Sequence, residues 1–526
     1  MMTSRNEEID VIVVGGGHNG LVCANYLARS GRSVLVLEAN DSFGGAASTL
    51  EFADNFRVSA CAHWLNQLNP KVLAELDLEN HGLKLAARDL NTISLAKDGN
   101  HLTLRSDGIE GVAVSELDRI AYLRFNSQML KFAELLAKLF ERRPPKIIDG
   151  DFGDRISLVK LAVGMKMLGK EDMRDLLRLV LINIYDVMEE NFESEQLKAA
   201  ISIDSVLGAH MGPRSPNTVF TYLYHKLGEV YGYKGPAVVE GGMGSLGEAL
   251  ASSAQASGVK LRCASKVEKI EVDVDQVAGV TLTDGEFIPC NTVVSNVDPK
   301  ATFENLVGFN NIETGVVRRV SNLRMQGNAA KLHLALSAVP QFTGLDDAQL
   351  GQRLIISPNM KQIDQAFNSA KYGEFSGETI MDVSIPSLHD STLAPEGSHV
   401  LSAIVQYAPY NLKQGWSQQA RDSFMSLIVE QLEQYAPGIG ELIVEKQLLT
   451  PVDLSEKFNL TGGHWHHGEI SVDQIMMMRP FPGASQYATS VDGLYLCGAG
   501  SHPGGGVMGL AGRNAAREIA KRQAKR

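Results

Sequence analysis

The sequence predicts an α/β fold in which a parallel-sheet domain, assembled from distant segments, is interrupted by a second, α+β domain. Two observations predict this arrangement. Near the N-terminus an apolar run, a glycine-rich turn, a helical pattern and a second apolar run follow one another, the order of a strand–helix–strand unit in a parallel sheet. The 50 glycines are also clustered, because residues 15–45, 235–247 and 498–512 hold 19 of them. Glycine lets backbone turn sharply or approach another group closely, so the clusters predict one site built from the start, middle and end of the chain.

Length and composition limit the classes of protein to which the chain can belong. Its 526 residues correspond to roughly two to four structural units, and 44% hydrophobic with 21% charged residues exclude a disordered or fibrous chain. The net charge of −12 argues against nucleic acid as the main partner, which requires a concentrated positive surface. The five cysteines, Cys23, Cys61, Cys263, Cys290 and Cys497, include no CxxC pair, and this excludes a disulfide scaffold, a zinc ribbon and a dithiol redox motif.

Residues 10–20 carry the first chemical motif, DVIVVGGGHNG, in which Gly15, Gly17 and Gly20 have GxGxxG spacing. The helical pattern LVCANYLARSG follows, and the next strand, SVLVLE, ends at Glu38. In a Rossmann-type dinucleotide-binding unit the first glycine permits a tight turn, the second lets backbone approach a pyrophosphate, and the third lets helix and strand pack closely. The helix N-terminus would bind the phosphates, and Glu38 would accept hydrogen bonds from the ribose hydroxyls. This motif does not distinguish NAD from FAD.

The middle of the chain mixes helical and β patterns. Residues 129–140 have apolar side chains at helical spacing and are followed by Pro144 and Pro145, which end the helix. Residues 173–188 repeat the helical pattern. After the second glycine cluster, the runs VKLRC, KVEKIEV, VAGVTLT and TVVSN predict strands. Residues 300–470 give no clear topology. The expected layout is a discontinuous dinucleotide-binding domain (1–75, 235–300 and 470–526) and a substrate domain with a helical part (76–234 and 301–469).

Gly242, Gly244 and Gly247 form a second GxGxxG, which on its own would suggest a separate nicotinamide site. The strand after it, VKLRC, ends without an acid or a suitably placed arginine to bind a ribose. We therefore expect this loop to lie inside the dinucleotide-binding domain.

Two glycine-rich segments resemble a known family. LEANDSFGGAAST, which contains Gly44, Gly45 and Ala46, is similar to the segment after the adenosine-binding acid in the phytoene desaturase and amine oxidase superfamily. GLYLCGAGSHPGGGVMGLAG at 493–512 resembles the C-terminal flavin-binding motif of carotenoid desaturases. The resemblance implies a discontinuous Rossmann-type FAD-binding domain with an inserted α+β substrate domain. The FAD-binding residues that we predict are Gly15, Gly17, Gly20, Glu38, Gly44, Gly45, Ala46, His63, Val267, Gly500, Ser501, Val507, Met508 and Gly509.

The segments HNGLVCANYL, FRVSACAHWL and HWHHGEISVDQIMMMRP look most like the pyridine nucleotide-disulfide oxidoreductase domain-containing protein 2 branch of that family. One departure limits what the branch name implies. No paired redox cysteines follow the dinucleotide motif, so the sequence does not support thiol–disulfide chemistry.

The run GGHWHHGE contains the candidate catalytic residues His467 and Glu469, together with His464 and His466. Three histidines and a carboxylate suggest a metal site, but on a strand His464 and His466 would share one face while His467 points away. We therefore predict an active-site loop and no metal, with His467 and Glu469, which match the family's HGE motif, in polar or acid–base roles. His502 is the third catalytic candidate; its alternative is a hydrogen bond that fixes the turn before Pro503.

The resemblance implies an FAD-dependent oxidoreductase that transfers a hydride between an apolar or amphipathic small molecule and flavin N5. A desaturase-type reaction at a C–H or C=C bond is the primary prediction; the electron acceptor is unknown, with oxygen and quinones as candidates. The alternatives are an amine oxidase, a redox-neutral flavin-dependent isomerase and a non-catalytic flavoprotein that acts through protein contacts. An amine oxidase would need an aromatic cage, for which the tryptophans available are Trp64, Trp416 and Trp465.

Residues 155–170, RISLVKLAVGMKMLGK, carry four basic side chains and no acidic one. On a helix the basic residues would fall within about 140° of one another, so the segment predicts either peripheral contact with a membrane or a helix of the substrate domain with its lysines in water. No run of 18 apolar residues that could span a bilayer occurs. The first ten residues, MMTSRNEEID, have no apolar core, so we expect a cytoplasmic enzyme without a secretory signal.

Overall fold

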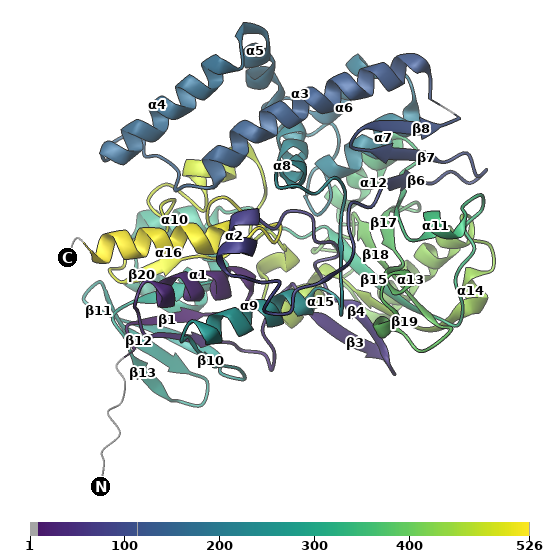
Figure 1. The fold of residues 1–526 in the computed structure, drawn as a ribbon. Coiled ribbons are helices and arrows are strands. Elements are labelled where there is room, and N and C mark those ends of the chain that lie inside the picture. Colours follow the sequence, from purple (N-terminus) through teal and green to yellow (C-terminus); the bar gives the residue numbers. More distant parts are fainter. Residues whose placement is uncertain (1–8, 113, 525–526) are drawn as a thin grey trace.

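Five parallel strands form the central sheet of the cofactor half of the molecule (Figure 1). The computed structural model describes residues 9–112 and 114–524. The strand order is β10 (Lys260–Arg262), β2 (Val34–Leu37), β1 (Val11–Val14), β14 (Val293–Ser295) and β20 (Leu494–Leu496). Strands from the start, middle and end of the chain therefore lie side by side, as the three glycine clusters predict. Residues 1–8, on which the expected absence of a secretory signal mainly rests, lie outside the described residues.

The two faces of this sheet bury alternate residues of β1, because successive side chains of a strand point to opposite faces. Val11 and Val13 pack in one cluster with α1 (His18–Arg29) and α16 (Leu510–Gln523). Ile12 and Val14 pack in another with β11 (Val267–Asp273), β12 (Gln276–Leu282) and the π-helix of residues 301–307. Both faces are covered, which explains the uninterrupted apolar run of β1.

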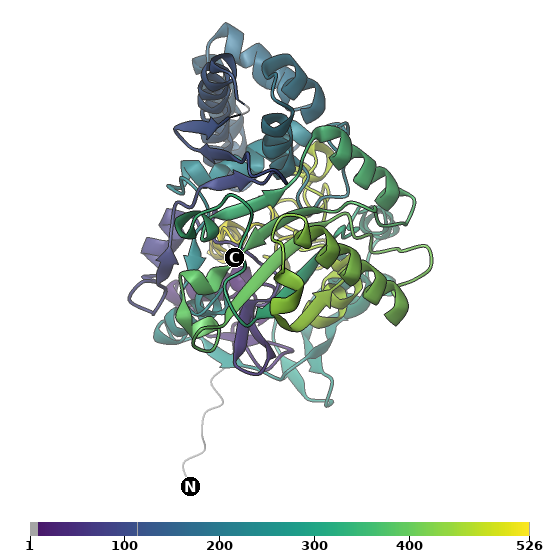
Figure 2. The ribbon, with the colours of Figure 1, turned by 90° about the vertical axis from the view of Figure 1, so that its right-hand side faces the viewer.

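A second, eight-stranded sheet forms the other half, in the order β19-β15-β18-β17-β16-β6-β7-β8 (Figure 2). Its strands come from the two segments assigned to the substrate domain: β6 (Thr92–Ser94), β7 (Leu102–Arg105), β8 (Gly108–Gly111), β15 (Ala329–Leu336), β16 (Arg353–Ile356), β17 (Ile380–Ser384), β18 (His399–Gln406) and β19 (Ile443–Leu449). Every residue of β15 is buried. The boundaries assigned to the two domains stay a prediction.

Helices form a layer at the top of Figure 1. They are α3 (Glu116–Phe140), α4 (Phe152–Met167), α5 (Lys170–Leu179), α6 (Ile184–Asn191), α7 (Glu195–Ser202) and α8 (Thr218–Val230). The helix predicted at 129–140 is the second half of α3, which ends before Pro144. A continuous helix over 173–188 is wrong: α5 and α6 are separate, because Asn183 caps a new helix by accepting a hydrogen bond from the backbone N–H of Asp186.

Short elements complete the fold: α2 (Pro70–Glu75), α9 (Gly244–Ala256), α10 (Thr314–Ser321), α11 (Asp347–Leu350), α12 (Met360–Lys371), α13 (Gln418–Glu433), α14 (Ile439–Leu442), α15 (Pro451–Phe458), β3 (Thr49–Ala53), β4 (Phe56–Ser59), β5 (Leu85–Ala87), β9 (Val238–Val239) and β13 (Phe287–Pro289). The second GxGxxG opens α9, which packs beside α1 and not in a separate nucleotide-binding unit. Within the part of the chain that the structure describes, no helix combines the length and apolar character that crossing a bilayer requires.

Candidate functional site

A cavity of about 440 Å³ opens at the carboxyl ends of β1, β2 and β14, where parallel α/β sheets bind nucleotides. We call it the cofactor cleft. Eight of the predicted FAD-binding or catalytic residues line it: Gly15, Gly17, Glu38, Gly44, Gly45, Ala46, Val267 and His467.

Two glycines of the first motif, Gly17 and Gly20, leave no room for a side chain. Gly17 and Gly44 pair as a parallel bridge, and a Cβ on Gly17 would lie 2.8 Å from Asn296 Nδ2. A Cβ on Gly20 would overlap the carbonyl oxygen of Gly15. Gly20 therefore allows α1 to pack against the turn, the structural role predicted for it, while Gly17 keeps the floor of the cleft open.

Glu38 follows β2 and is held in one orientation. Its Oε2 accepts a hydrogen bond from the backbone N–H of Gly16 at 2.7 Å, and its Oε1 accepts one from the backbone N–H of Asn40 at 2.9 Å. Burial raises the pKa of the Glu38 carboxyl, and these two backbone donors oppose that shift. Each carboxylate oxygen keeps a second lone pair, with which it could accept a hydrogen bond from a ribose hydroxyl.

Three buried polar atoms of the cleft have no hydrogen-bond partner among the described residues: His18 Nε2, Asn19 Oδ1 and His467 Nδ1. Burial and, to a smaller extent, the neighbouring His467 lower the pKa of His18 to about 4, so His18 is neutral at pH 7. Unpaired buried polar atoms are costly. Their convergence beside the N-terminus of α1 fits a bound dinucleotide that supplies polar partners.

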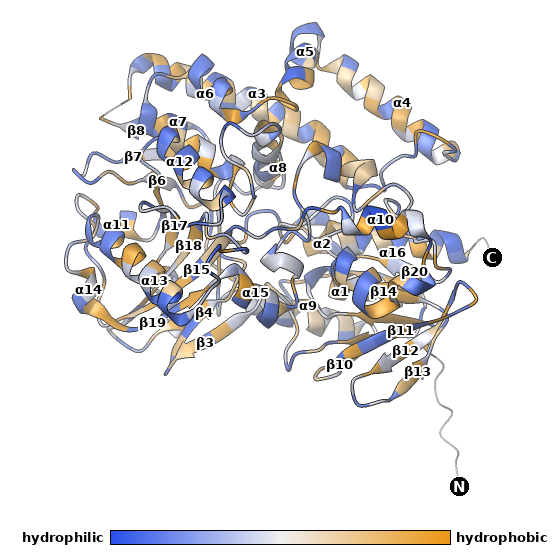
Figure 3. Cartoon of the chain, turned by 180° about the vertical axis from the view of Figure 1, so that it is seen from behind, coloured by the Kyte–Doolittle hydropathy of each residue, from blue (hydrophilic) through white to orange (hydrophobic). Residues whose placement is uncertain are grey.

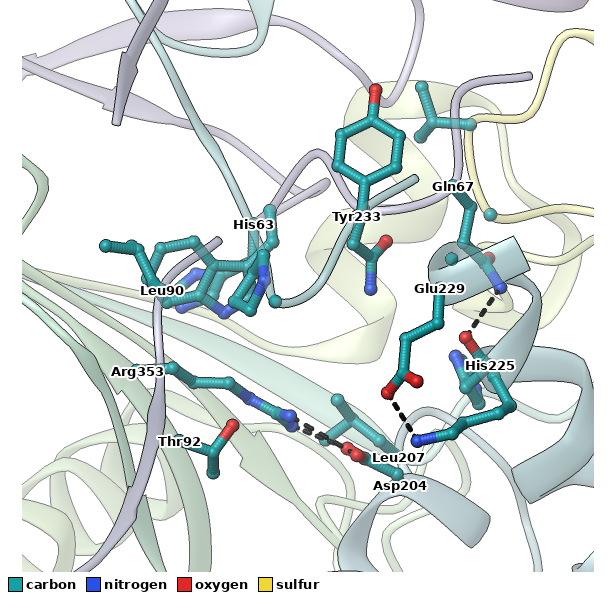
Figure 4. Close-up of a pocket in the computed structure, with 18 of the residues that line it drawn as sticks. His63, Gln67, Leu90, Thr92, Asp204, Leu207, His225, Glu229, Tyr233 and Arg353 are labelled. Carbon is teal, nitrogen blue, oxygen red and sulfur yellow. Dashed lines mark hydrogen bonds and ion pairs between the residues drawn. The ribbon is translucent and has the colours of Figure 1, made fainter. Parts of the chain in front are cut away.

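A second cavity, of about 260 Å³, adjoins the cofactor cleft, because His18, Ala46 and Trp465 line both. We call it the second cavity; Figure 4 shows part of it. His63 and Val507 line this cavity and not the cleft. Ala46, a predicted FAD-binding residue, lines both, so a cofactor held in the cleft would adjoin the second cavity there.

Buried ion pairs form part of the wall of the second cavity. The Arg353 guanidinium points toward Asp204 in Figure 4, at 2.7 Å, and lies 2.9 Å from Asp382. Burial alone would lower the pKa of Arg353, but the carboxylates of Asp204 and Asp382 have the larger combined effect and raise it. Arg353 is therefore charged. Lys226 forms a second pair with Glu229. The carboxylates of this wall therefore already have cationic partners.

His63 contacts a buried lysine behind the cavity wall. Lys331, on β15, has its Nζ 2.6 Å from His63 Nδ1 and 3.1 Å from the Ser402 hydroxyl. Burial lowers the pKa of Lys331 to about 7, and burial together with the Lys331 charge lowers the pKa of His63 well below its usual value. Below that pKa Lys331 is charged and can only donate, which places the proton of neutral His63 on Nε2. That N–H has no hydrogen-bond partner among the described residues.

The GGHWHHGE segment is a turn and not a strand: residues 461–463 form a 3-10 helix and His467 has a φ of 54°. The segment separates its polar residues among three places. His467 lines the cofactor cleft and His466 the second cavity. Glu469 lines neither; its Oε1 lies 3.3 Å from His464 Nε2 and accepts a hydrogen bond from the backbone of His210. Among the described residues, no group of three or more metal-ligating side chains could hold an ion.

Arg479 holds this turn in place. The side chain is fully buried and donates hydrogen bonds to the carbonyl oxygens of Glu469 and Gln474, at 3.0 and 3.1 Å, and to those of His466, Gly468 and Ala499. Burial lowers its pKa to about 10. The guanidinium thus satisfies carbonyls that the irregular backbone leaves unpaired.

Comparison with known proteins supports the flavin assignment. The pattern of the family described as flavin containing amine oxidoreductase matches residues 20–520. Pyridine nucleotide-disulfide oxidoreductase domain-containing protein 2 of Rattus norvegicus is 35% identical over 97% of this chain and 93% of its own length. The chain belongs to the flavin-containing amine oxidoreductase family.

Two more distant relatives agree with this assignment, and one solved structure shares the fold. A limonene dehydrogenase chain of Castellaniella defragrans is 26% identical over 98% of this chain and 95% of its own length. Phytoene desaturase (lycopene-forming) of Pantoea ananas is 24% identical over 95% of this chain and 96% of its own length. A triple mutant of putrescine oxidase, 15% identical, superposes with a TM-score of 0.65 over 99% of both chains, which shows the shared fold. The protein is an FAD-dependent oxidoreductase.

Several residues predicted in this family site lie outside both cavities. Gly500, Ser501, Met508 and Gly509 are among them; like Gly20, they are buried. That they contact FAD stays a prediction.

His502 is also outside both cavities. The side chain is fully buried with its ring edge-on to Phe140 at 5.5 Å, and burial lowers its pKa to about 3. This placement gives no support to a catalytic His502, which stays a prediction. Neither ring nitrogen has a hydrogen-bond partner among the described residues, so the alternative, a hydrogen bond that fixes the turn before Pro503, is not seen either.

Sequence reasoning missed Asn296, Lys331 and Arg353. Asn296 directly follows β14 and lines the cofactor cleft; a polar residue at the carboxyl end of a parallel strand is a signal that could have found it. Lys331 and Arg353 lie on fully buried strands. A single charge inside an apolar strand run indicates a paired, buried group.

Two cysteines that are far apart in the sequence, Cys23 and Cys497, lie in contact but form no disulfide. All five are free. Burial raises the pKa of Cys61 to about 12 and also raises that of the Cys290 and Cys497 thiols. Burial therefore disfavours the thiolate that thiol–disulfide exchange requires.

Proposed function

We propose that this FAD-dependent oxidoreductase removes a hydride from a C–H bond of an amphipathic small molecule, in a desaturase-type reaction. The observation that carries the proposal is the second cavity, which adjoins the cofactor cleft and combines apolar walls with paired charges. The limonene dehydrogenase and phytoene desaturase relatives support the reaction type by their names.

The lining of the second cavity favours an amphipathic substrate over a purely apolar one. Apolar contacts come from Leu90, Leu207, Ile404 and other side chains, while Thr92, His225 and Asn66 offer polar ones. His225 Nε2 is buried without a partner among the described residues. A wholly apolar polyene would leave that nitrogen unsatisfied, whereas a substrate hydroxyl or carboxylate could accept or share a proton there.

The charges of the second cavity argue against an amine substrate. Its two carboxylates, Asp204 and Glu229, are paired with Arg353 and Lys226, and Arg105 and Lys234 add positive charge at exposed positions. No unpaired carboxylate remains among the described lining residues to bind an ammonium group. Of the three tryptophans, Trp64 and Trp465 line the cavity, whereas Trp416 packs against Phe375 and Phe424.

Bound FAD supplies the hydride acceptor at N5. The protein would contribute orientation, exclusion of water and polar contacts at the junction of the cavities. His63 lines the second cavity; its Nε2 lies 3.9 Å from Asp382 Oδ1, too far for a hydrogen bond, and a charged Lys331 sets its tautomer. His467 and His466 would face the cofactor and the substrate respectively.

Anaerobic reduction of the purified holoprotein tests this proposal. We expect an oxidised flavin spectrum that is bleached by alkenes carrying a hydroxyl or carboxylate, and reoxidised by oxygen or a quinone. Amines of matched carbon skeleton should leave it oxidised. Bleaching by the amines and not by the alkenes would overturn the proposal in favour of an amine oxidase. Isomerised product that forms only with reduced flavin would favour the isomerase, and retained flavin without any turnover a non-catalytic role.

A further inference from the structure

Large hydrophobic side chains are exposed mainly in one part of this protein. Of the 19 that are exposed among the described residues, 13 lie between residues 112 and 181, in and around α3, α4 and α5. Helix α4 lies at the outer edge of this layer (Figure 1), and Figure 3 shows hydrophobic residues along much of its length. Exposed apolar residues that gather on one face mark a surface that contacts something else.

The outward side of α4 carries a continuous apolar stripe, Phe152, Ile156, Val159, Val163 and Met167. At 100° per residue these five positions fall within about 80° of one another. Phe152 is 78%, Val159 62% and Met167 81% exposed. Ile147 and Ile148, in the loop just before α4, are also exposed and extend the apolar surface.

Basic side chains lie beside the stripe. Arg155, Lys160 and Lys166 are exposed, and none of them has an ion-pair partner among the described residues. On the helical wheel they fall within about 80° of the centre of the stripe, on both sides of it. The helical wheel drawn from the sequence correctly predicts that the helix is basic. It is incomplete in two respects: apolar residues occupy both faces of α4, and Lys170 belongs to α5.

The acidic residues at the start of α4 are directed to the protein. Asp154 is buried, and both it and Asp151 pair with Arg143, at 3.0 and 2.6 Å. Asp151 also pairs with Lys521 of α16. These contacts anchor the N-terminal end of α4 to the flavin domain, so that its outward face presents apolar and basic groups together.

We propose that the outward face of α4 lies on an anionic lipid bilayer, a property separate from the proposed reaction. A protein with a net charge of −12 is repelled from an anionic surface unless positive charge is concentrated locally. An apolar stripe flanked by lysine and arginine suits such a surface, because the apolar side chains enter the acyl boundary while the basic groups contact the phosphates. The helix rests in the plane of the interface.

Vesicle flotation of the holoprotein tests this proposal. We expect at least a ten-fold higher bound fraction with phosphatidylcholine vesicles that contain about one third phosphatidylglycerol than with phosphatidylcholine alone, and a loss of binding between about 0.1 and 0.5 M salt. The double variant Val159→Asp/Val163→Asp should lose at least nine-tenths of the binding. Val274→Asp/Val444→Asp, which puts the same charges at exposed valines elsewhere, should bind as the wild type does.

A second pair of variants tests the contribution of the basic residues to vesicle binding. Lys160→Gln/Lys166→Gln should weaken binding several-fold, whereas Lys361→Gln/Lys446→Gln, at exposed lysines of α12 and β19, should not. Flavin content and thermal midpoint confirm that each variant is folded. Equal flotation with neutral and anionic vesicles, or wild-type binding by the valine variant of α4, would overturn the proposal. So would a dimer that dissociates in that variant while the wild type does not float, since the face would then bind a second copy.

Discussion

The buried ammonium of Lys331 makes a quantitative prediction about stability and pH. The perturbation is Lys331→Met, which keeps the length of the side chain but removes the titrating group. Burial lowers the pKa of Lys331 from 10.5 to about 7 in the folded protein. Between these two values the unfolded chain binds more protons than the folded one, so this group makes stability rise as the pH rises and fall as the pH drops towards 7.

The size of the effect follows from the shift. Burial of Lys331 lowers the free energy of unfolding by about 5 kcal/mol at pH 6, where both the folded and the unfolded protein bind the proton. At pH 9 the folded protein holds the neutral amine, and the cost is about 2 kcal/mol. The advantage of methionine over lysine should therefore be about 3 kcal/mol larger at pH 6 than at pH 9. Hydrogen bonds lost to His63 and Ser402 subtract a similar amount at both pH values, so they largely cancel in this difference.

Urea unfolding of the holoprotein in excess FAD measures this pH-dependent difference in stability. Wild type and Lys331→Met are compared at pH 6 and pH 9, with Lys361→Met, at an exposed position of α12, as the control. We expect the control to show the same difference from wild type at both pH values. If Lys331→Met shows that constant difference too, Lys331 is not a buried group with a lowered pKa.

Three further substitutions test the cofactor cleft and the second cavity. Glu38→Ala should weaken FAD binding by about 10- to 100-fold in equilibrium dialysis. Glu248→Ala, at an exposed position of α9, should retain the cofactor. Equal FAD occupancy in the two variants would contradict the assignment of Glu38 to the ribose. Arg353→Met leaves the fully buried carboxylate of Asp382 and the partly exposed one of Asp204 without their cation, and should cost about 3–5 kcal/mol in denaturant unfolding. A loss below about 1 kcal/mol would mean that water already solvates the carboxylates. Gly20→Ala should destabilise the protein by more than about 2 kcal/mol, because the new Cβ would overlap backbone. Gly315→Ala, in open space on α10, should stabilise it slightly. Similar unfolding midpoints for the two variants would refute the close packing of α1.

Local patterns in the sequence were sufficient for the cofactor half of the fold. The strand, turn, helix and second strand from Val11 to Leu37 lie where their periodicity predicts them, since each is set by neighbours in the chain. The strands expected at VKLRC, KVEKIEV, VAGVTLT and TVVSN are β10, β11, β12 and β14. Residues 300–470 gave no topology because the strand order of the eight-stranded sheet depends on pairing between remote segments.

Prediction of the candidate site was less complete, for a related reason. A motif names residues that are close in the chain, and the GGHWHHGE run suggested that His467 and Glu469 act together. The turn at His467 separates them, so that one lines the cofactor cleft and the other pairs with His464. Conversely, Lys331 and His63 are 268 positions apart and in contact, which no spacing rule indicates.

The sequence by itself determined the cofactor class of this protein. A dinucleotide is bound mainly by backbone, and the glycines that let the backbone approach it form short contiguous motifs in the sequence. It also determined that α4 would be basic. Only the tertiary structure decided which side of α4 is free, which carboxylates are already paired and where His502 lies. These depend on burial and on partners from distant segments, and burial is a property of the packed chain, not of any residue or its neighbours in sequence.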